Sequence, residues 1–237
     1  MRTKAAAVVL ALVLTAACGG DGGEGGGSGR DPGKEGAAGR DKTLTQAQLE
    51  SALLTLPDFP TGWEVNKQTE AAEDEVSVSP GADSECLQKY KNLSSSEKEG
   101  SAAVAVANFN APDGRGGVGQ LLKSYETDAD LEKQFEDAAK LVADCQTISS
   151  IDKDGARTDL TVGALSLPKL GDDSASFALN GKSSGIDIGI NYAVVRVGRT
   201  VTVLFHAGFA INTADTAVLE EAAKKAVTKL EAVVAAA

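Results

Sequence analysis

The stretch GIDIGINYAVVRVGRTVTVLFHAGF, residues 185–209, decides the fold class because it reads as two long β-strands joined by a tight turn. Isoleucine, valine and aromatic residues dominate both halves, which is typical of strands. Gly198-Arg199 separates the halves, and a glycine in a two-residue loop suits the primed turns of β-hairpins. The stretch therefore predicts an antiparallel hairpin.

Shorter strand-like runs precede this hairpin. Asn180-Gly181 predicts a second turn, and the glycine-rich segment 112–119 reads as the connector between two runs. The runs cover residues 61–65, 101–109, 119–127, 158–167 and 173–179.

Helical patterns lie between and after these runs. Thr45 and Gln48 form a capping-box pattern at the start of a helix that should stop at Pro57. Asp128 and Asp130 should cap the start of a long helix. The apolar stripes are Leu131, Phe135, Ala138, Val142 and Cys145 in the long helix, and Leu219, Ala223, Ala226, Leu230 and Val233 in a C-terminal helix. Helices and antiparallel strands without a β-α-β rhythm predict an α+β fold.

The first residues follow the layout of a secretory signal peptide. Arg2 and Lys4 give a basic start, and the apolar run 5–17 is shorter than the about 20 residues of a transmembrane helix. Leu14-Thr15-Ala16-Ala17-Cys18 resembles the lipobox of bacterial lipoproteins, although threonine replaces the usual leucine three residues before the cysteine. In that family the cysteine thiol receives a diacylglyceryl group and the peptide is cut before it. We therefore predict lipidation of Cys18, with palmitate as an acyl chain, at the outer face of the cell membrane.

Two other interpretations of this start remain open: simple secretion with a free Cys18, and a segment that is not cleaved. Residues 19–42 mix glycine with charged residues and have little to bury, which indicates a flexible tether. The predicted division is a signal peptide over 1–17, a lipidated glycine-rich tether over 18–42, and one α+β domain over 43–237.

The charge balance argues against nucleic acid as a partner. The formal net charge is −11, and it becomes −13 when the signal peptide with Arg2 and Lys4 is removed. An acidic protein is repelled by phosphate backbones and by anionic lipid surfaces. Aromatic residues make up only 4% of the chain, and no basic stripe carries them. Membrane association is therefore expected through the lipid anchor alone.

Two cysteines remain once Cys18 is lipidated. Cys86 lies in the short helical pattern 83–93, and Cys145 lies on the inward stripe of the long helix. Exported chains meet an oxidising compartment, so this pair predicts a disulfide that pins the short helix to the long one. A metal site is the poorer interpretation, because two thiols and one histidine do not make four ligands. No metal or cofactor is predicted.

Two short motifs match catalytic or nucleotide-binding patterns. Gly114, Gly116 and Gly119 spell GxGxxG, and residues 181–185 spell GxSxG. The first pattern needs a helix directly after it, and the second needs a strand-turn-helix with its serine at the turn. A strand-like run follows each of them here, so both are interpreted as loops of the sheet.

His206 is the only histidine, and any imidazole base would have to be this residue. It is out of phase with Val201, Val203 and Phe205, which places it on the outer face of the sheet or in a groove. Ser183, Asp187 and His206 are the residue types of a catalytic triad, but their order in the sequence is no evidence that they lie close together.

The acidic run at residues 70–75 lacks the alternating ligands of an EF-hand and is interpreted as a solvated loop.

The domain resembles the extracellular sensor domain of PknH-type serine/threonine kinases of actinobacteria, which stand-alone surface lipoproteins also carry. The resemblance rests on LLTLPDFPTGWEV (53–65), on VADCQ (142–146) and on YAVVRVGRTVTVLF (192–205), together with the paired cysteines. It implies a twisted antiparallel sheet packed against helices, and a cleft for an unknown ligand. The kinase domain carries two disulfides, whereas one pair is present here.

The function favoured by these observations is a membrane-anchored module that binds a ligand or a cell-surface protein. The alternative is a lipid or glycolipid carrier with an apolar cavity; the few Phe and Leu residues on the strands favour a polar cleft instead. A purely structural or adhesive role remains open. An enzyme is not expected, because one histidine and no motif in its required context leave no catalytic residues to name.

Overall fold

A computed structural model describes residues 41–67, 77–78, 84–96, 100–112, 114, 116–152, 154–209 and 214–237. All of them belong to one unit of the chain, Pro32–Ala237. The predicted signal peptide, Cys18 and the acidic run at 70–75 lie outside the described residues, so their assignments remain predictions.

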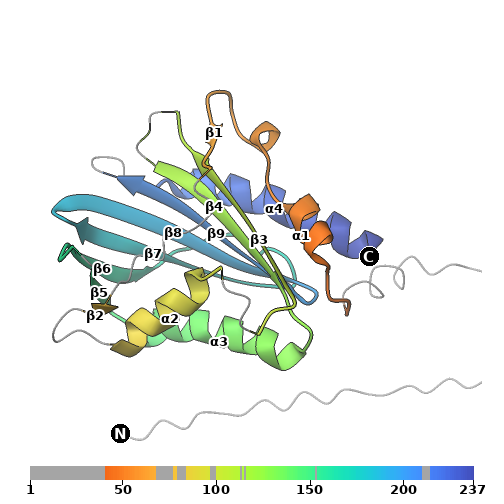
Figure 1. Ribbon diagram of the computed structural model, residues 1–237, viewed down its shortest axis with the longest axis horizontal. Helices are drawn as coiled ribbons and strands as arrows, with labels where there is room; N and C mark the ends of the chain where they lie inside the picture. The colour runs from red at the N-terminus through yellow and green to blue at the C-terminus, as the bar shows by residue number, and fades with distance from the viewer. Residues whose placement is uncertain are drawn as a thin grey trace, which may run out of the picture. The chain divides into compact units, whose positions relative to one another are not determined.

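The described chain forms an α+β domain around an antiparallel sheet, as predicted (Figure 1). The sheet order is β1-β3-β4-β9-β8-β7-β6-β5-β2. The helical elements are α1 (Gln46–Ala52), the 3-10 turn η1 (Leu56–Asp58), α2 (Ser84–Ser94), α3 (Asp128–Asp144) and α4 (Thr216–Ala236). The strands are β1 (Glu64–Val65), β2 (Ser77–Val78), β3 (Ala103–Asn110), β4 (Gly116–Ser124), β5 (Thr147–Ile151), β6 (Arg157–Ala164), β7 (Asp173–Ser183), β8 (Ile186–Val197) and β9 (Thr200–Phe209).

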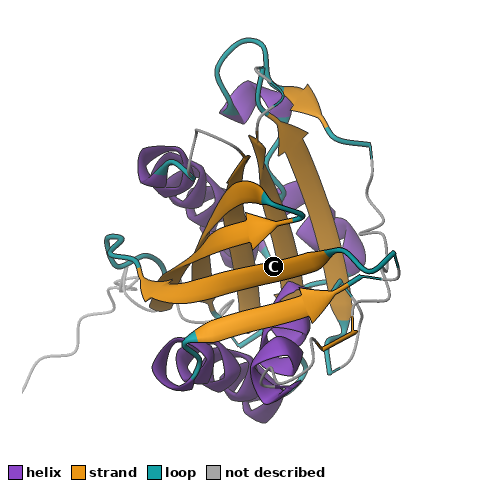
Figure 2. Ribbon diagram, turned by 90° about the vertical axis from the view of Figure 1, so that its left-hand side faces the viewer, coloured by secondary structure: helices purple, strands orange, loops and turns teal. Residues whose placement is uncertain are grey.

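Helices cover both faces of this sheet. Helices α1 and α4 lie on one face, and α2 and α3 lie on the other (Figure 1). The sheet twists strongly, so that strands at its two ends cross at a wide angle (Figure 2). No described helix is both long enough and apolar enough to span a bilayer.

The central strands β8 and β9 are joined by the turn predicted at Gly198-Arg199, where Gly198 has a φ of 58°. Their side chains alternate between two apolar cores. Tyr192 and Val203 pack on the α2/α3 face, whereas Ala193 and Leu204 pack under α4. Burial on both faces explains why residues 185–209 read as nearly continuous apolar runs.

The second predicted turn was wrong. Asn180 and Gly181 lie inside β7, paired with both β6 and β8. The chain turns instead at Ser184-Gly185, whose φ angles are 50° and 82°. Gly181 has a different reason to be glycine, because a Cβ there would collide with the carbonyl oxygen of Asp159 on the neighbouring strand. Close strand approach, and not a turn, requires the residue.

Other differences concern the ends of elements. Thr127, and not Asp128 or Asp130, caps α3, because its side chain accepts a hydrogen bond from the Asp130 N–H. The predicted connector 112–119 is in part strand, since β4 begins at Gly116. The first helix ends earlier than the predicted stop at Pro57, because α1 ends at Ala52 and the exposed Leu56 belongs to η1.

Two strands of the sheet were not expected from the sequence. They are β5 and β2, which complete the end of the sheet beyond β6. Strand β5 has five residues and only two buried ones, and β2 has two residues in all. Runs this short carry too little alternation to be recognised.

The predicted disulfide is present and joins Cys86 in the first turn of α2 to Cys145 at the end of α3. Both cysteines are buried in the core on this face. Helix α2 has 11 residues and buries only Cys86, Leu87 and Leu93. An isolated helix of this length is marginal in water, so its position depends on the bond and on this small contact.

We expect the Cys86→Ser/Cys145→Ser variant to lose about 2–5 kcal/mol in its free energy of unfolding. The loss should appear first as local opening of α2, because few other contacts hold that helix. Hydrogen–deuterium exchange measures this as faster exchange at residues 84–96 than in β8 and β9. Equal acceleration across the whole domain would contradict the expectation.

Candidate functional site

The described helices α2 and α3 cover only part of the face of the sheet on which they lie. The β7–β8 end of the sheet extends beyond both helices (Figure 1). Two of the exposed large apolar side chains lie there, Ile186 at 56% exposure and Phe209 at 45%. Three further apolar residues lie on the same face. We call the five residues together the apolar strip: Ile186, Ile188, Ile190, Phe205 and Phe209.

The strand register builds this strip. Alternate residues of β8 point to the same face, and Phe209 lies directly opposite Ile188 in the β8–β9 ladder. Exposure falls along the strip, because Ile188, Ile190 and Phe205 are half-buried and pack against the main core. The strip therefore descends from the open tip of the hairpin into the domain.

Aromatic rings close the inner end of the strip. Tyr192 follows Ile190 on the same face and lies opposite Phe205, with 5.8 Å between the ring centroids. The Phe177 ring stacks on Tyr192 at 4.8 Å, and Tyr90 of α2 meets Tyr192 edge-on at 6.2 Å. Offset-stacked and edge-on arrangements of this kind are favourable for aromatic rings.

The two phenol groups contact each other. The hydroxyl oxygens of Tyr90 and Tyr192, the tyrosine pair, are 3.1 Å apart, within hydrogen-bonding distance. Burial raises the pKa of the Tyr90 phenol, although its hydrogen bond with Tyr192 opposes the shift. Burial, together with Tyr90, raises the pKa of Tyr192 well above its ordinary value. Both hydroxyls are therefore protonated at neutral pH.

A glycine makes room for the aromatic part of the strip. A Cβ at Gly119 of β4 would collide with the Phe205 ring, and it would also approach the Asn108 amide oxygen at 2.7 Å. The Phe205 ring thus lies flat over the backbone of the neighbouring strand. Gly119 was one of the glycines in the GxGxxG match, and its role in the structure is this contact.

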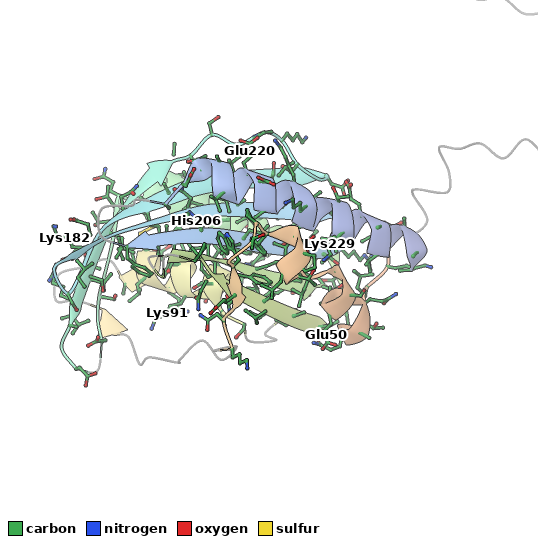
Figure 3. The ribbon with its side chains drawn as sticks, turned by 90° about the horizontal axis from the view of Figure 1, so that it is seen from above. Glu50, Lys91, Lys182, His206, Glu220 and Lys229 are labelled. Atoms are coloured by element: carbon green, nitrogen blue, oxygen red, sulfur yellow. A yellow bond between two sulfur atoms is a disulfide. The ribbon has the colours of Figure 1, made fainter. Side chains whose placement is uncertain are left out.

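His206 lies on the opposite face, where it was expected, but α4 covers it. Its exposure is 8%, and Figure 3 shows it on the sheet beneath that helix. The Nδ1 atom accepts a hydrogen bond from the backbone N–H of Asp215, the residue that caps α4, at 2.9 Å. Asn191, its cross-strand neighbour, donates to the carbonyl of Ala214 and to the Thr216 hydroxyl. The two side chains fasten the start of α4 to the sheet.

The residues of the hypothetical triad are not brought together. Ser183 is on the face of Phe177 and Leu179, where its hydroxyl contacts that of Thr158 at 2.8 Å. His206 is on the other face, and Asp187 forms an ion pair with Lys182 at the tip of the sheet. The GxSxG residues end β7 and form its turn into β8, so there is no nucleophile elbow. Among the described residues, no three His, Cys, Asp or Glu side chains gather as metal ligands would.

The sequence interpretation missed the apolar strip and the tyrosine pair. Counting Phe and Leu favoured a polar cleft, whereas isoleucine supplies most of the lining at the open end of this face. The signal was the alternation in IDIGINY (186–192), which puts three isoleucines and Tyr192 on one face. Tyr90 lies 102 residues away in the sequence, and no pattern within the strand points to it.

The domain is thus an α+β sheet sandwiched between helices, with an apolar strip open on one face. Among solved structures, it is similar to the extracellular domain of PknH from Mycobacterium tuberculosis, with a TM-score of 0.56 and 14% sequence identity. The match covers 81% of this chain and 98% of that chain. At this identity the likeness establishes the fold, which agrees with the resemblance inferred from the sequence. No protein-family model and no curated protein matches the chain.

We expect His206→Ala to lower the free energy of unfolding by about 1–3 kcal/mol, because the Asp215 N–H would lose its acceptor in a buried place. His206→Asn should recover part of this loss, since its amide oxygen can replace Nδ1. Urea unfolding of the three proteins measures the difference. An asparagine variant as unstable as the alanine variant would show that the hydrogen bond is unimportant.

Proposed function

We propose that this chain is a lipid-anchored lipoprotein of the outer face of the cell membrane, and that its domain binds a ligand or a partner protein as a sensor-like module. The apolar strip carries this proposal. Large contiguous apolar patches on a protein surface mark interaction sites, and the strip places exposed and half-buried apolar side chains next to one another. The strip has a defined direction, from an open tip to a buried polar end.

Three further observations support the cellular side of the proposal. Lipidation through the lipobox-like residues 14–18 would explain why Cys18 stands directly before a glycine-rich tract. The Cys86–Cys145 disulfide is the kind of bond that forms and persists outside the cytoplasm. The similar fold occurs in an extracellular domain of PknH.

The alternative is a lipid or glycolipid carrier. The apolar side chains of the strip favour a carrier more than the small number of Phe and Leu residues in the sequence did, because a carrier has to cover the hydrocarbon of its cargo. A carrier also has to enclose its cargo, whereas Ile186 and Phe209 stand at an open rim. We therefore keep the binding module as the first proposal.

The strip should account for binding. We expect Ile186→Glu/Phe209→Glu to reduce the binding of a fluorescent hydrophobic dye by tenfold or more, because two carboxylates would enter its open end. Val65→Glu is the matched control, since Val65 is 49% exposed on the edge strand β1. Fluorescence titration measures the three affinities. Equal loss in the control, or no loss in the double variant, would contradict the proposal.

The anchor is tested separately. We expect Cys18→Ser to release the protein into the medium or to leave the precursor uncut, because no thiol would be present to receive the diacylglyceryl group. Membrane fractionation and intact mass distinguish these results from the wild type. A Cys18→Ser protein that remains with membranes at mature size would refute lipidation.

A further inference from the structure

The tyrosine pair leaves one hydrogen-bond donor over. Its two hydroxyls carry two protons, and the contact between them uses one of these. In the described part of the structure neither hydroxyl forms another hydrogen bond. Tyr192 is 3% exposed and Tyr90 is half-buried, so bulk water has little access to the Tyr192 hydroxyl and limited access to that of Tyr90. A buried donor without an acceptor is costly, which makes this place receptive to an oxygen atom.

The surroundings of the pair are neutral. The rings of Phe177 and Phe205 lie against Tyr192, and among the described residues no charged side chain is a cause of the raised pKa of either phenol. An anionic group placed here would lose its hydration without gaining a cation, at a high cost. The acceptor that fits is therefore an uncharged oxygen.

The strip gives the rest of the ligand its shape. From Tyr192 to Ile186 the strand advances six residues, which is about 20 Å. Along this length the strip offers aliphatic and aromatic side chains, with the Ser183 hydroxyl beside Ile186 at its open end. An extended hydrocarbon chain would cover them and remove both partners from water.

From these contacts we propose that the site takes a neutral long-chain ester, ketone or alcohol, with its oxygen at the tyrosine pair and its hydrocarbon along the apolar strip. This inference rests on the proposed binding function and adds the chemical class of the ligand. Tyr90 comes from α2, so the position of that helix also sets the position of the donor.

The test compares three probes of similar chain length, used on the intact mature domain. They are methyl tetradecanoate, tetradecanoate and pentadecane, each measured by displacement of the hydrophobic dye at neutral pH. We expect the ester to bind about fivefold to tenfold more tightly than the alkane, which is the effect of one hydrogen bond. The carboxylate should bind more weakly than the ester.

The deciding variant is Tyr90→Phe/Tyr192→Phe. Removing both hydroxyls together leaves no stranded partner, so the packing should be kept and the alkane should bind as before. The preference for the ester should disappear. Tyr125→Phe is the matched control, because Tyr125 is a buried tyrosine of the same core and is not part of the pair; it should retain the preference.

The outcomes separate the two proposals. If the wild type binds ester and alkane equally, or if the double variant keeps the ester preference, the ligand class is wrong while the binding site stands. If tetradecanoate binds best, the oxygen that the site selects is charged and the inference fails. If none of the three probes binds, the strip is not a small-molecule site and the proposed ligand binding falls as well, leaving a protein partner.

Discussion

Burial of β8 and β9 on both faces is the constraint on which the other contacts depend. One set of side chains must fit α2 and α3, and the alternate set must fit α4. Helix α4 meets the sheet with small residues, Ala222, Ala223 and Ala226, which allow a close approach. A shift of one residue in either strand would exchange the two sets and destroy both cores. The register of this hairpin is therefore fixed more firmly than that of any outer strand.

The two faces are covered unequally, and this inequality produces the site. Helix α4 has 21 residues and is fastened at its start by His206 and Asn191. On the other face, α2 and α3 leave the β7–β8 end of the sheet open. The short α2 nonetheless contributes Tyr90, and the disulfide holds that helix to α3. A covalent bond thus helps to hold Tyr90, one member of the partly buried tyrosine pair, in place.

Much of the fold could be predicted because its strongest signals are local. The alternation in residues 185–209 and the capping box at Thr45 and Gln48 depend only on neighbours in the sequence. The turn predicted at Asn180-Gly181 was wrong because the preference of these residues for turns is local, and pairing of β7 with its neighbours overrides it. His206 could be placed on the correct face, but its covering by a helix that starts ten residues later could not be predicted from that strand.

The candidate site was less predictable, because its signals are not local in the sequence. It depends on which part of a face the helices leave open, and on a contact between Tyr90 and Tyr192 that joins distant segments. The cysteine pair was the exception, since only one pairing remains once Cys18 is set aside for its predicted lipidation.

The edges of the sheet affect how copies of the domain interact when many of them lie close together. Strands β1 and β2 at the two edges have two residues each, and β1 pairs with only Phe109 and Asn110 of the eight residues of β3. If the domain is held on a membrane, as we propose, its copies meet at high local concentration, where open edges can join sheet to sheet. Among the described strands none pairs with the rest of the outer side of β3, so contacts between crowded copies would form at that edge first unless another segment covers it.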